Sequence, residues 1–173
     1  MIGFATEEPI AESAASIWDP LAATPISIFL RESTWSYPAL EIVHIIGIAL
    51  VFGSILSFDL RVLGAHKSLP LNTLGRHLIP WVWIGFALNA VSGVLMFVSN
   101  PVEFAANPAL TAKLALIGIA GINAVYFQRR VVPTMPEWNA DAPAPLAART
   151  SALLSIALWL AVIVAGRMMA YVV

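Results

Sequence analysis

The sequence contains no cysteine among its 173 residues. This absence excludes disulfide bonds, cysteine-ligated zinc, iron–sulfur clusters and covalently attached c-type haem. Charge is also scarce, because Lys, Arg, Asp and Glu make up 11% of the chain, against about 25% in soluble domains. With nine basic and ten acidic residues, the chain has no long basic face that could follow a phosphate backbone. Nucleic acid is therefore not expected as a partner.

Apolar residues are correspondingly abundant. They make up 60% of the chain, and its mean hydropathy is +0.85. A span of about 30 Å of hydrocarbon needs roughly 20 apolar residues in helical form. Short connections place neighbouring helices antiparallel. We therefore predict an all-α integral membrane four-helix up-down bundle, as one transmembrane domain over residues 36–173, with spans at about 38–60, 78–99, 108–126 and 146–173.

Residues 1–35 are predicted to form a separate N-terminal segment. Residues 1–20 carry four acidic and no basic side chains, so the basic region of a signal peptide is missing and we expect the first span to direct insertion. Residues 21–35 are too short to cross the bilayer. Thr24-Pro25 is typical of a helix start, and Trp18 and Trp35 are typical of the headgroup region. This pattern predicts an interfacial amphipathic helix.

Basic residues predict the orientation of the bundle. They follow the first and third spans, at Arg61, Lys67, Arg76, Arg129, Arg130 and Arg149. Loops rich in Lys and Arg stay in the cytoplasm. We therefore expect a multi-pass protein of the bacterial inner membrane, in contact with membrane lipid and with both termini in the periplasm.

Four ionisable residues fall inside the apolar runs: Glu41, His44, Lys113 and Arg167. A helical rise of 1.5 Å per residue places all four in the outward part of the bundle. Ionisable groups in hydrocarbon are costly, so they face a protein interior and have a partner or a task. We predict a structural ion pair of Glu41 with Arg167, or alternatively with Lys113. Lys113 and Arg167 also suit the anionic groups of a cofactor.

His44 is the predicted metal ligand and centre of the site, and two chemical roles are open. Its imidazole can bind haem iron, with Lys113 and Arg167 neutralising the propionates, or it can donate to a quinone carbonyl. A second axial ligand could come from Met168, from Met96 or Met169, or from His44 of a second protomer. Met side chains also suit Cu(I). The simplest alternative is an interior histidine bonded to a neighbouring carbonyl, beside an ion pair that orients the bundle.

Other polar residues have simpler interpretations. His66 and His77 flank the first cytoplasmic loop, more than roughly 20 Å from His44, and are expected to be solvated. Asn89 and Asn123 lie near mid-membrane and are expected to bond between helices.

The stretch from Tyr37 to Ser54, with Glu41 and His44 in it, resembles a family of small, poorly characterised bacterial inner-membrane proteins. So does the later set of Gly93, Asn107-Pro108 and Lys113. That family is distantly similar to the copper-resistance D (CopD) group and to four-helix b-type cytochromes. The resemblance covers about residues 35–130. It implies a helical bundle whose first-span histidine serves haem or copper. The chain lacks the two histidine pairs of the four-helix cytochromes.

Three functions follow as expectations. The first is a haem-b electron-transfer subunit, without independent catalysis, that links the quinone pool to a periplasmic-side redox partner. The second is a copper-handling membrane protein. The third is an accessory subunit, with no cofactor, of a larger membrane complex. A homodimer is also compatible with the sequence.

Overall fold

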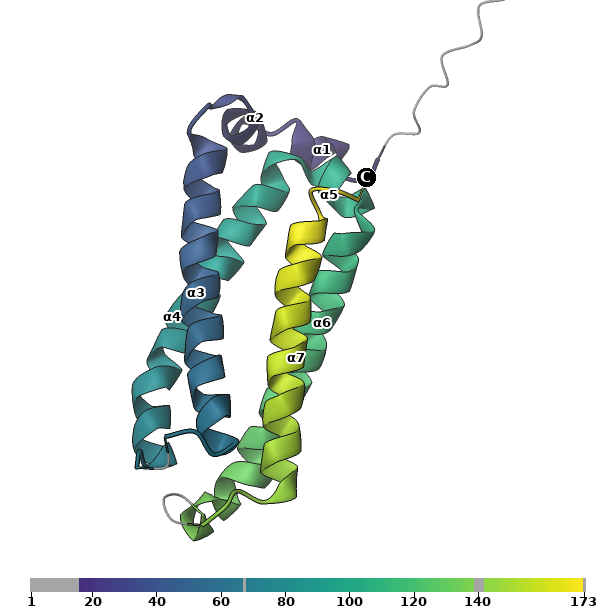
Figure 1. Cartoon of the computed structure of the whole chain (residues 1–173). Coiled ribbons are helices and arrows are strands. Elements are labelled where there is room, and N and C mark those ends of the chain that lie inside the picture. Colours follow the sequence, from purple (N-terminus) through teal and green to yellow (C-terminus); the bar gives the residue numbers. More distant parts are fainter. Residues whose placement is uncertain (1–15, 67, 139–141, 173) are drawn as a thin grey trace, which may run out of the picture.

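Four long helices dominate the computed structural model, which describes residues 16–66, 68–138 and 142–172. These helices are α3 (Ser36–Val62), α4 (Leu71–Ser99), α6 (Pro108–Tyr126) and α7 (Leu146–Met168). They run alternately up and down (Figure 1), and no strand occurs in the described residues. The predicted all-α up-down bundle is therefore confirmed.

Three short helices gather at one end of the bundle, which we call the terminal end. They are α1 (Asp19–Ala22), α2 (Pro25–Glu32) and α5 (Pro101–Ala106), and the C-terminus lies beside them (Figure 1). The predicted start of α2 is confirmed, because the Thr24 hydroxyl accepts a hydrogen bond from the Ser27 amide at 3.4 Å. The α2 helix contacts both α3 and α4, so it lies across the end of that hairpin.

The opposite end, which we call the loop end, holds the connections from α3 to α4 and from α6 to α7. The second connection continues α6 through a π-helical turn, η1 (Phe127–Val131), and a 3-10 helix, η2 (Val132–Glu137). A buried hydrophobic core lies here, because these turns fold back over the helix ends. Its members come from five elements and the adjoining turn: Val62, Leu71, Val131, Met135, Trp138, Ala148 and Ala152.

The bundle consists of two helical hairpins. The α3 helix packs along α4, the α6 helix packs along α7, and the hairpins meet mainly through α3 and α7. The crossing of α3 and α4 is close because glycines face each other there. A Cβ on Gly47 would lie 2.9 Å from the Gly85 carbonyl oxygen, and a Cβ on Gly85 would lie 2.8 Å from the Gly47 carbonyl oxygen.

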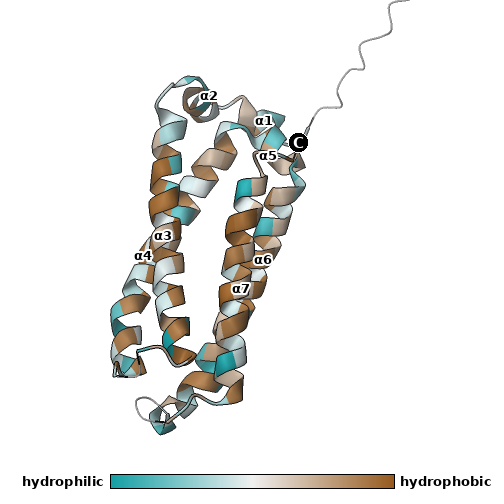
Figure 2. Cartoon of the chain, viewed as in Figure 1, coloured by the Kyte–Doolittle hydropathy of each residue, from teal (hydrophilic) through white to brown (hydrophobic). Residues whose placement is uncertain are grey.

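The long helices consist mostly of hydrophobic residues along their length (Figure 2). Large side chains point away from the bundle, including Ile122 at 72% exposure and Trp83 at 67%. Such a surface suits hydrocarbon and not water. Four segments are long and apolar enough to cross a membrane: Ser36–Val62, Leu71–Ser99, Pro108–Glu137 and Leu146–Met168. The chain is a multi-pass membrane protein.

The helix boundaries differ from the predicted spans by more than two residues at two places. The α4 helix begins at Leu71 and not at 78, and it continues through Pro80. A proline breaks only one backbone hydrogen bond, and Leu71 is 1% exposed in the loop-end core, so packing holds the extra turns in place. The α7 helix ends at Met168 and not at 173, and a turn follows it. The bounds of α6, 108–126, are as predicted.

Candidate functional site

His44 is the centre of a polar cluster that joins three helices. It lies two turns into α3, and both ring nitrogens have a partner. Nδ1 lies 2.9 Å from Ser92 Oγ on α4, and Nε2 lies 3.3 Å from Lys113 Nζ on α6. The predicted convergence of His44 and Lys113 is therefore present in the structure. The partner on the other ring nitrogen, Ser92, was not predicted.

The chemistry of the partners fixes which atom donates in each hydrogen bond. A lysine ammonium can only donate, so His44 Nε2 accepts from Lys113. In the neutral ring the proton then sits on Nδ1, which donates to Ser92 Oγ. The Ser92 hydroxyl donates a hydrogen bond to the Leu88 carbonyl at 2.6 Å. The three bonds form one directional chain, from Lys113 through His44 to Ser92.

Two glycines bring the other helix faces close to this chain. A Cβ on Gly93 of α4 would lie 3.4 Å from His44 Cε1, and a Cβ on Gly166 of α7 would lie 3.5 Å from Lys113 Nζ. Larger side chains at these positions would press on the imidazole and on the ammonium group. Each of the four spanning helices therefore contributes to the cluster.

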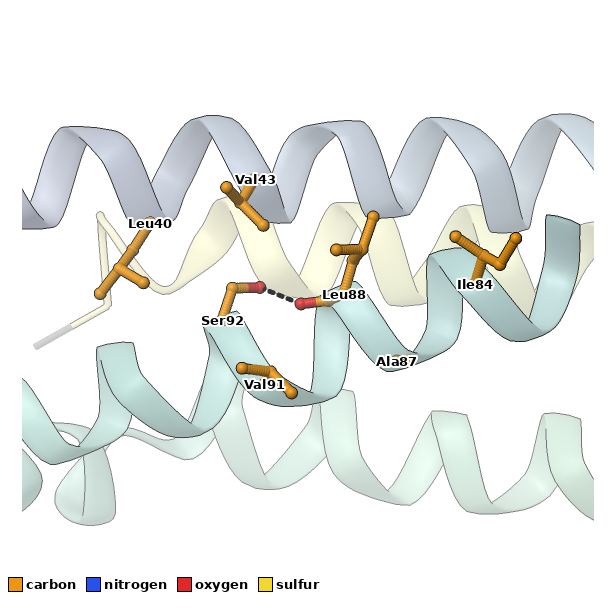
Figure 3. Close-up of a pocket in the computed structure, with 7 residues that line it drawn as sticks. All are labelled: Leu40, Val43, Ile84, Ala87, Leu88, Val91 and Ser92. Atoms are coloured by element: carbon orange, nitrogen blue, oxygen red, sulfur yellow. Dashed lines mark hydrogen bonds between the residues drawn. The ribbon is translucent and has the colours of Figure 1, made fainter.

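A groove opens beside Ser92 on the outer side of α3 and α4. Figure 3 shows the residues that line it, and its volume is about 340 Å³. Ser92 is the one polar residue in its lining, and its hydroxyl is hydrogen-bonded to Leu88 within the groove wall. The remaining lining is apolar: Leu40, Val43, Ile84, Ala87, Leu88 and Val91. Its walls belong to membrane-spanning segments, so an apolar molecule in the bilayer could enter it.

The structure does not bring the other predicted site residues into this cluster. Arg167 is exposed, donates from Nη2 to the Tyr171 hydroxyl at 2.8 Å and stacks on that ring at 5.1 Å. Met168 is 42% exposed. Glu41 is exposed, and within the described residues it forms no ion pair with Arg167 or Lys113. The predicted ion pair is absent because Arg167 turns to the residue four positions ahead on its own helix.

The remaining polar predictions have mixed outcomes. Asn123 bonds between helices as expected: it accepts from Ser151 Oγ at 2.8 Å and donates to the Ser151 carbonyl at 3.1 Å. The prediction for Asn89 was wrong, because its amide donates to the Gly85 carbonyl on its own helix. His66 and His77 are exposed, as predicted. The described residues contain no cluster of three His, Cys, Asp or Glu side chains that could hold a metal ion.

Ser92 could have been found from helical spacing alone. It lies three residues after Asn89 and seven after Gly85, which places it on the same face of α4 as those two residues. Serine is common in membrane helices, however, and its pairing with His44 depends on the register of two helices that are 48 residues apart in the chain. The contact between Gly47, one turn from His44, and Gly85, two turns from Ser92, holds the two helices in this register.

We compared the chain with known protein families, curated proteins and solved structures. No curated protein and no solved structure matches the chain significantly. One family model, described as "Family of unknown function (DUF6644)", matches residues 36–172. The match begins at the first residue of α3 and includes all four spans, so it contains the His44, Ser92 and Lys113 cluster. Because the match covers more than half of the sequence, the chain belongs to this family of unknown function.

Proposed function

We propose that this protein is a membrane redox subunit that exchanges protons with a quinone at Ser92, using Lys113 and His44 as the proton source. The observation that supports it is the common direction of the three hydrogen bonds. Lys113 donates to His44, His44 donates to Ser92, and Ser92, which is 1% exposed, is among the residues that line the lipid-facing groove. Such a chain delivers a proton from the bundle interior to the groove.

Quinones match this arrangement in both parts of their structure. Their isoprenoid tails are apolar and reside in the bilayer, as the aliphatic walls of the groove require. Their head groups carry carbonyl oxygens that accept hydrogen bonds. The Ser92 hydroxyl now donates to Leu88, and rotation about its side-chain bond would redirect it to a carbonyl oxygen in the groove.

The redox step requires electrons from a partner. Reduction of a quinone to a quinol takes up two electrons and two protons. In this proposal a redox protein at the terminal end supplies the electrons, and the Lys113, His44 and Ser92 chain conducts the protons one at a time. His44 passes its Nδ1 proton to Ser92 and receives another at Nε2 from Lys113, so it ends in the opposite tautomer. Before the second proton can follow, Lys113 must regain a proton from water and the imidazole must return to its first tautomer.

Orientation is part of the same proposal. The loop end carries Arg61, Arg76, Arg129, Arg130 and Arg149, so it belongs in the cytoplasm by the positive-inside rule. The terminal end, and with it the redox partner, then faces the periplasm of a bacterial inner membrane. Assembly with that partner in a larger complex accounts for a subunit without catalysis of its own.

A second candidate is a haem b subunit, in line with the distant resemblance to b-type cytochromes. One observation favours it: the bond from Nδ1 to Ser92 orients the ring and leaves Nε2 unprotonated, as an axial ligand requires. The space around Nε2 argues against it, because Lys113 Nζ lies 3.3 Å away in the direction that iron would occupy. Met168 and Arg167 are exposed and do not flank this nitrogen. The quinone proposal requires no rearrangement of Lys113.

Quinone binding tests the proposal directly. The purified chain in lipid nanodiscs is titrated with a short-chain ubiquinone, and binding is followed by quenching of tryptophan fluorescence. Loss of one hydrogen bond to a buried acceptor costs about 1–3 kcal/mol, so Ser92→Ala should weaken binding by a factor of about 5 to 150. His77→Ala, at the loop end, is the matched control and should bind as the wild type does.

Three outcomes would contradict the proposal. Equal affinity of Ser92→Ala and wild type would remove Ser92 from the site. A Soret band in the wild type that disappears in His44→Ala would favour the haem candidate. A wild type that neither binds quinone nor shows a chromophore would leave His44 as a hydrogen-bonded interior histidine.

A further inference from the structure

A second ionisable group is buried far from the groove. Asp59 lies three residues before the end of α3, at the loop end, and it is 6% exposed. Its carboxyl group faces the Ser155 hydroxyl of α7. The Oδ2 atom is buried and has no hydrogen-bond partner in the described residues. Fifteen residues of helix, or roughly 22 Å, separate Asp59 from His44, so the two groups belong to different sites.

Several charged side chains lie on the elements that surround this carboxyl group. Arg61, two residues further along α3, is buried and donates from Nε to the Leu69 carbonyl at 2.7 Å. The others that flank the loop end are exposed: Arg76 and His77 on α4, Arg129 and Arg130 on η1, and Arg149 on α7. The interactions of Asp59 in the described residues are therefore its contact with Ser155 and its burial.

A buried carboxyl group of this kind is stable in its neutral form. Transfer of an unpaired carboxylate out of water is so unfavourable that the group takes up a proton instead. We propose that Asp59 is a proton-binding site, which takes up a proton from water at the loop end and holds it as the neutral acid between α3 and α7. The Ser155 hydroxyl is compatible with either form, because a hydroxyl can donate or accept.

Further polar groups lie near this site on α7 and α6. Ser151 lies one turn nearer the start of α7 than Ser155, and its hydroxyl donates to Asn123 of α6. Ser155, Ser151 and Asn123 thus form a polar stripe between apolar helix faces. The stripe offers hydrogen-bonding groups along which a proton could reach Asp59 from the cytoplasmic loops. This inference does not depend on quinone binding at Ser92.

Infrared spectroscopy tests the proposal on the full chain in nanodiscs. A protonated carboxyl group has a C=O stretching band above the amide I band, and the band shifts in D₂O. The wild type should show this band at neutral pH, and carboxyl-¹³C aspartate should shift it to lower frequency. Asp59→Asn should lose the band. Glu41→Gln, which removes an exposed carboxyl group from the same helix, should retain it.

The labelled wild type keeps the test valid even where Asp59→Asn folds poorly. Asp19 is exposed, so among the described aspartates Asp59 is the buried one. Absence of an aspartate-derived band in the wild type at neutral pH would overturn the proposal. A band that persists unchanged in folded Asp59→Asn would overturn it as well.

Discussion

The close crossing of α3 and α4 makes a quantitative prediction. Gly47→Ala would place a methyl group 2.9 Å from the Gly85 carbonyl oxygen and 2.7 Å from Asn89 Nδ2. Gly85→Ala would place one 2.8 Å from the Gly47 carbonyl oxygen and 2.8 Å from Leu50 Cβ. Two of these neighbours are backbone atoms, so relief requires the helices to separate.

The size of the effect follows from the overlap. Ordinary contact begins at about 3.4 Å, so each methyl group intrudes by about 0.5 Å on the opposing backbone. A gap of about 0.5–1 Å along a packed interface already loses a quarter to a half of its dispersion attraction. Overpacking of this kind costs about 1–3 kcal/mol. We expect each variant to be destabilised by that amount relative to Gly53→Ala, whose methyl group would meet nothing within 4 Å.

Unfolding of the purified variants in detergent micelles, followed by circular dichroism, measures this difference. Gly53→Ala lies on the same helix and carries the same change in helix propensity, so it isolates the steric term. The double variant Gly47→Ala/Gly85→Ala should lose less than the sum of the single losses, because both methyl groups require the same helix separation. Stabilities of Gly47→Ala and Gly85→Ala equal to that of Gly53→Ala would refute the reasoning.

Three further predictions concern single contacts and topology. Asn107→Ala should lower stability by about 0.5–2 kcal/mol, because Asn107 caps α6. It should also speed proteolysis after α7, because the Asn107 amide donates to two carbonyls beyond that helix. Asn107→Asp should restore only the cap. Ser151→Ala should cost about 1–3 kcal/mol in the same unfolding assay, because it leaves the Asn123 amide oxygen without its donor; a neutral effect would show that water replaces the hydroxyl. A periplasmic reporter should be active after the C-terminus and inactive in the loop between α3 and α4, and the reverse would contradict the proposed orientation.

Sequence reasoning predicted the fold well because hydrophobic length and helix-end signals act locally. Asn107-Pro108 marks the start of α6, and Asn100 follows the end of α4. It failed where tertiary packing overrides a local signal. The apolar run predicted that the second span starts at 78, whereas burial of Leu71 in the loop-end core extends α4 by seven residues. The short α5 helix was also missed, because its six residues carry too little periodicity.

The candidate site was predicted only in part, for a related reason. Depth along a helix is readable from residue counts, so His44 and Lys113 were expected at the same level and do meet. The direction in which a long side chain turns is not readable in this way. Arg167 was expected to reach Glu41 across the bundle, but a tyrosine four residues ahead on its own helix provides a nearer partner. Side-chain partners at a helix end are therefore the least predictable part of such a site.

The two ends of the bundle differ in packing, and the difference fits the two proposals. The buried hydrophobic cluster lies at the loop end, where η1 and η2 close over the helix ends. That packing can hold a buried carboxyl group such as Asp59 out of water. The terminal half is held instead by hydrogen bonds and glycine contacts around His44, with a groove open beside Ser92. Regions with less buried apolar surface open at lower free-energy cost. A lipid-soluble ligand, which must enter and leave, is therefore better placed in the terminal half. A proton can reach a buried group without separation of the helices, so the tightly packed loop end suits a proton-binding site.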